Sequence, residues 1–215
     1  MTARIINRRA FLQVCGTITV GFIGTLALPT SQPAMADSPP RSNGFVASDP
    51  IARLAAEALA AVGDEQYASH RDKVASAVAS RLELDLIAMQ RAWATADVDH
   101  QIAILTGLTQ LGVPYRRNTS MPGVGFDCSG LTTYAWAGAG YDLTRQSTAQ
   151  IRQSAPRSIE TAQAGDLMQY PGHVMIWLGL GRAVLQSPNP RRTVEVVLYR
   201  EGRNVKVGDP TGRVS

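Results

Sequence analysis

Apolar side chains recur with helical spacing through residues 50–95 of this 215-residue chain. A first helix is predicted for residues 50–62, where the apolar positions that share one face are Ile51, Leu54, Ala55 and Ala58. A second, longer helix is predicted for residues 67–94, where the shared apolar face comprises Val74, Val78, Leu82, Leu86 and Met89. Such stripes are typical of helix packing, so we interpret residues 50–95 as a helical extension and not as a cofactor site.

A third helical pattern follows the extension, and after it the sequence becomes rich in turn residues. Residues 98–111 are predicted to be helical, with Asp97 as the N-cap and Gly112 as the stop signal. The segment GVPYRRNTSMPGVGF, which comes next, is rich in turn residues and leads into a predicted helix at 129–137. A polar loop with a short helix near 148–153 precedes the last part of the domain.

Short β-rich runs bounded by turn residues close the pattern. They are predicted at residues 166–170, 174–178, 183–186 and 194–199. Alternation along the second run places His173 on the same face as Met175 and Trp177. Helices followed by strands with tight turns indicate an α+β fold with an antiparallel sheet. The remaining residues, 201–215, are predicted to form a frayed polar tail.

The first 36 residues have the order of a signal peptide. Basic residues come first, an apolar stretch covers residues 10–28, and the sequence AMA at 34–36 is a small-x-small cleavage pattern. Within this segment, NRRAFLQ resembles the twin-arginine export signal, because two adjacent arginines precede apolar residues. We therefore predict a twin-arginine-type signal peptide at 1–36, followed by a Pro/Ser/Gly linker at 37–49.

A retained membrane anchor is the alternative interpretation of this segment, since residues 10–28 could nearly span a bilayer. Its glycines, its prolines and the cleavage pattern favour removal. Removal leaves 18 basic and 17 acidic side chains, and this nearly neutral balance gives no electrostatic basis for nucleic-acid binding. We expect the mature chain to be exported to the cell wall, a periplasm-like space or the exterior, without stable membrane insertion.

Cys128 is the only cysteine of the predicted mature chain, because Cys15 lies within the signal peptide. Exported proteins usually pair their cysteines, so an unpaired one is either buried and inert or used in chemistry. Cys128 lies at the start of the helix predicted for 129–137. Free N–H groups at a helix N-terminus stabilise a thiolate, the nucleophilic form, and can also stabilise an oxyanion.

His173 is the histidine best suited to act with Cys128, because it begins an apolar strand where a buried imidazole needs a partner. Cysteine–histidine pairing, with a third polar group holding the ring, is a recurring way to activate sulfur. Gln186, in the next β-rich run, is the candidate third group. Alternatives from the same segment are Ser187 and Asn189. The other histidines are interpreted as surface residues: His70 and His100.

Four segments around these residues occur in a characteristic order: LGVPYRRNTSMPGVGFDCSGLTTYAW, LTRQSTAQ, AGDLMQY and GHVMIWLGLGR. Together they resemble the NlpC family of bacterial cell-wall cysteine endopeptidases, over about residues 97–199. The resemblance implies a papain-like α+β fold, with a catalytic domain at 96–200. It also implies hydrolysis of peptidoglycan stem peptides, usually at the bond between D-glutamate and a diamino acid such as diaminopimelate.

The resemblance also implies roles for individual residues. The cysteine of DCSG is Cys128, the nucleophile, and the histidine of GHV is His173. The implied substrate-binding residues are Tyr115, Asp127, Ser129, Arg145 and Ser147. Arg145 is expected to meet a substrate carboxylate. The chain departs from the family pattern in two places. Thr144 stands where proline is common. The third catalytic group is most often histidine in the family; an ungapped alignment places Leu185 there, and an alignment with one extra residue places Gln186 there.

No cofactor is predicted, because the sequence has no metal-ligand spacing, Gly-rich phosphate loop or nucleotide motif. The expected partners are peptidoglycan stem peptides. Two other functions stay open: an amidase or acyl transferase that uses the same Cys–His pair on another substrate, and a cell-wall binding module without catalysis. The helical extension at 50–95 is either a spacer or a segment that packs over the cleft and restrains activity.

Overall fold

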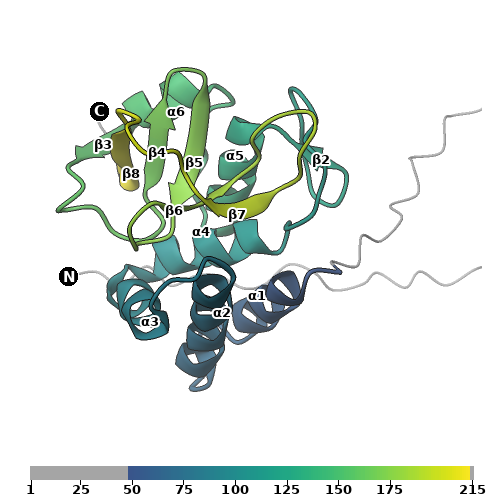
Figure 1. Cartoon of the computed structure of the whole chain (residues 1–215), viewed down its shortest axis with the longest axis vertical. Helices are drawn as coiled ribbons and strands as arrows, with labels where there is room; N and C mark the ends of the chain where they lie inside the picture. The colour runs from purple at the N-terminus through teal and green to yellow at the C-terminus, as the bar shows by residue number, and fades with distance from the viewer. Residues whose placement is uncertain (1–47, 214–215) are drawn as a thin grey trace, which may run out of the picture. The chain divides into compact units, whose positions relative to one another are not determined.

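A computed structural model describes residues 48–213 of the chain. The predicted signal peptide, residues 1–36, and nearly all of the predicted linker, residues 37–49, lie outside the described residues. Within the described range the chain forms six helices and eight strands, and the α+β fold class is confirmed (Figure 1). None of the helices in this range is long and apolar enough to cross a membrane.

Three helices form the N-terminal extension: α1 (Pro50–Ala60), α2 (Tyr67–Arg81) and α3 (Leu86–Thr95). The prediction of one helix over residues 67–94 is therefore wrong. The chain leaves α2 through Glu83, whose φ of 56° is left-handed and incompatible with a continuing helix. It starts again at Asp85, whose carboxylate accepts a hydrogen bond of 2.7 Å from the backbone N–H of Ala88.

A six-stranded antiparallel sheet forms the second part of the fold, in the order β3-β8-β4-β5-β6-β7. Its strands are β3 (Ser154–Arg157), β4 (Leu167–Tyr170), β5 (His173–Trp177), β6 (Ala183–Gln186), β7 (Glu195–Leu198) and β8 (Lys206–Arg213). The strands β4 to β7 confirm the four predicted β-rich runs. Two short strands, β1 (Ser120–Met121) and β2 (Gly125–Phe126), pair with each other outside this sheet.

Strand β8 shows that the prediction of a frayed tail at 201–215 is wrong. Residues 206–213 pair with β3 on one side and with β4 on the other, where Leu167 lies opposite Gly208. The strand has the sequence KVGDPTGR, which contains glycine and proline and lacks a β-branched alternation. Its extended state is therefore imposed by pairing with distant segments and has no local signal.

The side chains of β5 divide the core between the two faces of the sheet, as the predicted alternation requires. Val174 and Ile176 belong to a large apolar cluster shared with the helices. Met175 and Trp177 belong to a smaller cluster on the other face, together with Met168, Val184 and Val207. Strand β5 is buried on both faces, so the backbone of its first residue, His173, is held in place by the core.

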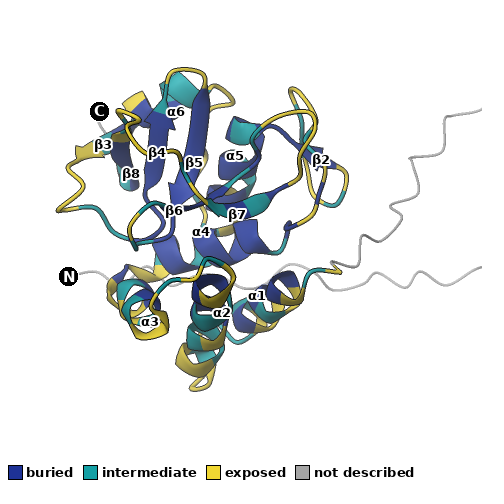
Figure 2. Cartoon of the chain, in the orientation of Figure 1, coloured by how far each residue is buried: buried dark blue, intermediate teal, exposed yellow. Residues whose placement is uncertain are grey.

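Helix α4 (Val98–Leu108) connects the extension to the rest of the fold. It is buried over most of its length and appears mainly dark blue in Figure 2. Gly107 allows its close approach to β6, because a Cβ at this position would lie 2.7 Å from Cδ2 of Leu185. Helix α4 contacts α1 on one side and α5 (Cys128–Gly138) on another, so it lies between the start of the extension and the helix of Cys128.

The helical extension is packed into the domain and is not a detached spacer. Its buried residues belong to the same apolar cluster as the helices and strands that follow it. Trp93 of α3 is fully buried and donates its indole N–H to the carbonyl of Leu178, at 2.9 Å. The alternative that residues 50–95 restrain activity remains a prediction.

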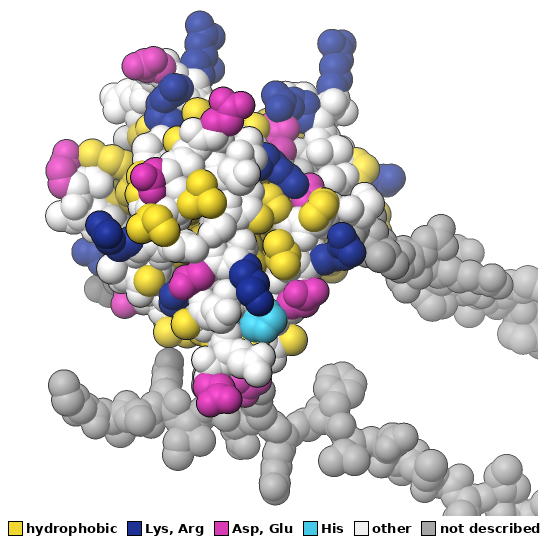
Figure 3. Space-filling model, turned by 60° about the horizontal axis from the view of Figure 1, so that its bottom comes forward, with side chains coloured by type: hydrophobic (Ala, Val, Ile, Leu, Met, Phe, Trp, Pro, Cys, Tyr) yellow, Lys and Arg dark blue, Asp and Glu magenta, His cyan; other side chains and the backbone are white. Residues whose placement is uncertain are grey.

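The surface around the extension mixes charges of both signs. Figure 3 shows Lys and Arg side chains interspersed with Asp and Glu, and separate hydrophobic side chains between them. The exposed large hydrophobic residues include Leu86 and Ile87 of α3 and Val98 of α4. This face therefore carries no extended patch of one charge sign.

Candidate active site

Helix α5 begins at Cys128 because Asp127 provides its N-cap. The Oδ1 atom of Asp127 accepts a hydrogen bond of 2.6 Å from the backbone N–H of Gly130, which satisfies one of the free donors of the first turn. The thiol of Cys128 is half-buried at this helix end. The sequence prediction of a helix start near this cysteine therefore agrees with the structure to within one residue.

Opposing effects act on the thiol of Cys128. Burial raises its pKa, and the charge of Asp127 adds to this increase. Hydrogen bonds from the backbone N–H groups of Val174, Ser129 and Cys128 lower the pKa, but the net direction is upward from the ordinary value of 9.0. The helix N-terminus thus favours the thiolate as expected, and burial outweighs it. The contact with Val174 places the sulfur beside the strand residue that directly follows His173.

His173 is buried at the start of β5 and is held by a chain of polar side chains. Its Nε2 atom lies 2.8 Å from Oε1 of Gln186. The Nε2 atom of Gln186 donates to Oε1 of Glu195 at 3.0 Å, and Oε2 of Glu195 pairs with Nη2 of Arg192 at 2.6 Å. The structure therefore brings Gln186 to the imidazole, and it adds Glu195 and Arg192, which the sequence prediction missed.

The hydrogen bonds that Gln186 makes with His173 and Glu195 determine which nitrogen of His173 carries the proton. A carboxylate only accepts hydrogen bonds, so Glu195 requires the NH2 group of the Gln186 amide. The amide oxygen of Gln186 then faces His173 and requires a proton on Nε2. In the neutral ring Nδ1 is consequently unprotonated and is the basic nitrogen.

The surroundings of His173 keep the imidazole neutral. Burial lowers its pKa below the ordinary value of 6.5, and the charge of Arg203 adds to this decrease. The hydrogen bond to Gln186 and the charge of Glu195 act in the opposite direction and are outweighed. A neutral imidazole can accept the proton of a thiol, which is the protonation state that general-base catalysis needs.

Three predicted substrate-binding residues form one polar cluster next to Cys128. Arg145 contacts both carboxylate oxygens of Asp127, each at 3.1 Å, and Ser129 donates to the backbone carbonyl of Arg145 at 2.7 Å. Tyr115 is half-buried nearby; burial raises its pKa, and so do the charges of Cys128 and Asp127. Arg145 is therefore already paired with a carboxylate of the protein, and a substrate carboxylate would have to share it with Asp127.

Other polar residues of these segments lie in structural positions. Ser147 is the first residue of α6 (Ser147–Gln153) and is half-buried. Gln150, on the same helix, is buried and donates to the carbonyl of Thr144 at 2.7 Å. Ser187 donates to the carbonyl of Phe126 at 2.7 Å, and so it does not take the position beside His173 that Gln186 holds.

A second titratable cluster lies in the core of the fold. His100 of α4 is fully buried, so the prediction that it is a surface residue is wrong. Its Nε2 atom lies 3.0 Å from Oδ1 of Asp166 and 3.3 Å from Oδ1 of Asp209, and Arg157 pairs with the other oxygen of Asp209. Burial lowers the pKa of His100, but its carboxylate partners outweigh burial and raise the pKa to about 9. These residues meet in space despite the absence of ligand spacing in the sequence, and they form a charged imidazolium between two carboxylates.

The segment that carries Cys128, His173 and Gln186 matches a known protein family. The NlpC/P60 family model matches residues 112–204. A probable endopeptidase of Corynebacterium glutamicum is 32% identical over 133 residues, which are 60% of this chain and 63% of that protein. The peptidoglycan endopeptidase RipA of Mycobacterium tuberculosis is 33% identical over 116 residues, with 46% of this chain and 24% of RipA covered. The chain thus spans less than two thirds of each of these two relatives.

Solved structures include related domains. RipD of Mycobacterium tuberculosis, described as a non-catalytic NlpC/p60 domain protein adapted to peptidoglycan binding, is 31% identical. The comparison covers 53% of this chain and 98% of the RipD chain, with a TM-score of 0.45.

Proposed function

This chain belongs to the NlpC/P60 family, and from this premise we propose that it is an exported cysteine peptidase acting on peptidoglycan. Its substrate is the stem peptide, and the bond that it cleaves joins D-glutamate to a diamino acid such as diaminopimelate. The observation that carries the proposal is the contact of the Cys128 thiol with the backbone of Val174 in β5, the residue directly after a histidine whose Nδ1 atom is left free as a base.

The proposed reaction starts with proton transfer from the thiol of Cys128 to Nδ1 of His173. The sulfur attacks the amide carbonyl carbon, a C–S bond forms, and N–H groups at the start of α5 stabilise the oxyanion. His173 then protonates the leaving nitrogen as the C–N bond breaks, and an acyl-enzyme remains. His173 next takes a proton from water, which attacks the thioester. The product leaves with a new carboxylate, and Cys128 regains its proton.

The test is digestion of purified peptidoglycan fragments by the full chain, with products identified by mass spectrometry. We expect new termini at the D-glutamyl–diamino acid bond. Cys128→Ala should abolish them, whereas His70→Ala, in a half-exposed histidine of α2, should leave them unchanged. Products of other masses would indicate amidase or acyl-transfer chemistry, and the absence of any product would contradict the proposal.

A peptidoglycan-binding module without catalysis is the second candidate function. The observation that favours it is the half-buried position of Cys128, because burial raises the pKa of the thiol and disfavours the reactive thiolate. Alkylation by iodoacetamide near pH 7 separates the two candidates. An active pair should react quickly, and His173→Ala should slow the reaction. Slow alkylation of both forms, together with retention of the chain on insoluble peptidoglycan, would favour the binding module.

A further inference from the structure

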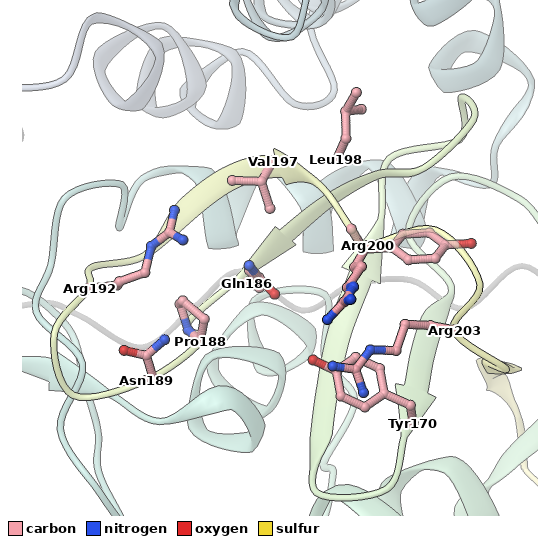
Figure 4. Close-up of a pocket in the computed structure, with 10 residues that line it drawn as sticks. Tyr170, Gln186, Pro188, Asn189, Arg192, Val197, Leu198, Arg200 and Arg203 are labelled. Carbon is pink, nitrogen blue, oxygen red and sulfur yellow. The ribbon is translucent and has the colours of Figure 1, made fainter.

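A cavity of about 380 Å3 lies next to the polar chain that holds His173 (Figure 4). Gln186 forms part of its wall, and Arg192 lies at one end of it. At the other end the guanidinium groups of Arg200 and Arg203 lie close to the ring of Tyr170 in this view. This volume suits a side chain or a small charged group.

The charges in this cavity are unbalanced. Three arginines line it, and no acidic side chain does so. Arg192 is neutralised by Glu195, outside the cavity wall. Among the described residues, Arg200 and Arg203 have no acidic partner. Arg203 is held over the ring of Tyr170, at 4.6 Å from its centroid, so its position is defined by stacking.

The cavity borders the His173 side of the candidate active site. The ring of Tyr170 lies 5.2 Å from that of His173, and Gln186 contacts both the cavity and the imidazole. The charge of Arg203 also lowers the pKa of His173, so this guanidinium is within electrostatic range of the proposed base. The pair of Asp127 and Arg145 lies instead at the N-terminus of α5, beside the nucleophile.

We propose that Arg200 and Arg203 bind a carboxylate on the leaving side of the scissile bond. This inference rests on the proposed function, in which His173 protonates the leaving amine and therefore lies next to the diamino acid. Guanidinium groups pair well with carboxylates, and an anion between them relieves their mutual repulsion. The preferred stem peptide then has a diamino acid with a free second carboxylate, and a stem with lysine or an amidated carboxylate is a poorer substrate.

Two synthetic stem peptides test this site when they differ only in a free or an amidated second carboxylate. For the full chain we expect kcat/KM to be about tenfold higher for the free acid, as for a charge-assisted hydrogen bond. The double variant Arg200→Gln/Arg203→Gln should lose this preference. The control Arg53→Gln, in an exposed arginine of α1, should keep it. Cleavage of both peptides at equal rates by the unmodified chain would overturn the inference and leave the proposed function intact.

Binding to the Cys128→Ala chain separates the two proposals. NMR titration with the free-acid peptide should shift the side-chain signals of Arg200 and Arg203, and the double arginine variant should bind about tenfold more weakly. If the double variant binds more weakly but the unmodified chain cleaves no peptide, the carboxylate site is supported and the proposed peptidase activity is contradicted. Equal affinity of the double variant would overturn the site. Inorganic phosphate is the comparison ligand: arginine-dependent phosphate binding without discrimination between acid and amide would also overturn the carboxylate assignment.

Discussion

Gln186 holds two partners at once, and this property makes Glu195 a positioning residue for His173. Replacement of Glu195 by Leu removes the acceptor that orients the Gln186 amide. The amide can then rotate, and its NH2 group would favour the His173 tautomer protonated on Nδ1. We expect kcat to fall by at least about tenfold with little change in KM, because the base and not substrate binding is affected.

Steady-state kinetics and 15N NMR of the histidine ring measure this effect. The unmodified chain should show His173 protonated on Nε2, and Glu195→Leu should show a mixture of tautomers. Glu57→Leu, in an exposed residue of α1, is the matched control. An unchanged tautomer with reduced kcat would contradict the positioning role of Glu195.

The thiol and the imidazole of the proposed reaction have pKa values displaced in opposite directions. Burial lowers the pKa of His173 below 6.5 and raises that of Cys128 above 9.0. The neutral pair therefore predominates between these values, and we expect kcat/KM to be level there. Activity should decline only below pH 6.5, where the imidazole is protonated, and above pH 9, where the thiol proton is lost. A pH–rate profile on a synthetic stem peptide measures both limbs, and an acid limb above pH 6.5 would disagree with the structure.

Sequence motifs single out Cys128 and His173 as candidate residues, but they do not indicate the groups that contact them. Glu195 reaches Gln186 because β6 and β7 pair in one register, with these two residues opposite each other. Register depends on contacts between strands, and no local pattern of β7 specifies it. The direction of the net pKa shift at Cys128 also depends on burial, which the helix N-terminus alone does not predict.

At the scale of elements, two helices with similar N-caps allow a matched comparison. Asp127 caps α5 and Asp85 caps α3, and each side chain accepts a backbone hydrogen bond within its first turn. We expect Asp127→Ala and Asp85→Ala each to lower the free energy of unfolding by about 1 kcal/mol. Only Asp127→Ala should also lower activity, because it releases Arg145 and the first turn of α5.

Urea unfolding and peptide cleavage assays check this pair of variants. If Asp85→Ala reduced activity as much as Asp127→Ala, the loss would reflect general destabilisation. The special role of the α5 cap would then be contradicted.

Elements with strong local periodicity could be predicted, and those created by distant contacts could not. The strands β4 to β7 are short, mainly apolar runs bounded by turns, so the sequence indicates them directly. The break between α2 and α3 depends on the left-handed backbone of Glu83, a conformation that this residue type does not signal. Strand β8 depends on pairing with β3 and β4, which lie about 40 to 60 residues earlier in the chain.

At the scale of the whole molecule, the buried cluster of His100, Asp166 and Asp209 links stability to pH. The pKa of His100 is raised from 6.5 to about 9, so its contribution is complete below pH 6.5 and is lost as the pH rises through 9. Burial opposes ionisation of Asp209, but hydrogen bonds from His100, Arg157 and Thr211 outweigh it and hold the pKa well below 3.8. The contribution of Asp209 is therefore present above pH 3.8 and lost as the pH falls.

We expect the contribution of this cluster to the unfolding free energy to be highest between about pH 4 and pH 6.5, and to decline towards pH 9 by up to about 1.4 kcal/mol per pH unit. Urea unfolding at several pH values measures this profile. Asp209→Asn should flatten the decline on the alkaline side, because it removes one partner that raises the pKa of His100. A stability that is constant from pH 6.5 to 9 would contradict the assignment of His100 as an imidazolium.

The place of β8 between β3 and β4 also has a consequence for the order of folding. The strands β4 to β7 are neighbours in sequence as well as in the sheet, so they can form early from short-range contacts. The strands β3 and β4 are also consecutive in the chain, yet they must stay apart until residues 206–213 return and insert between them. Among the pairings of the six-stranded sheet, insertion of β8 is therefore the step with the largest loop-closure entropy, and until it occurs two unpaired strand edges are exposed to other chains. The last strand thus determines both when the sheet is complete and how long the chain is open to aggregation.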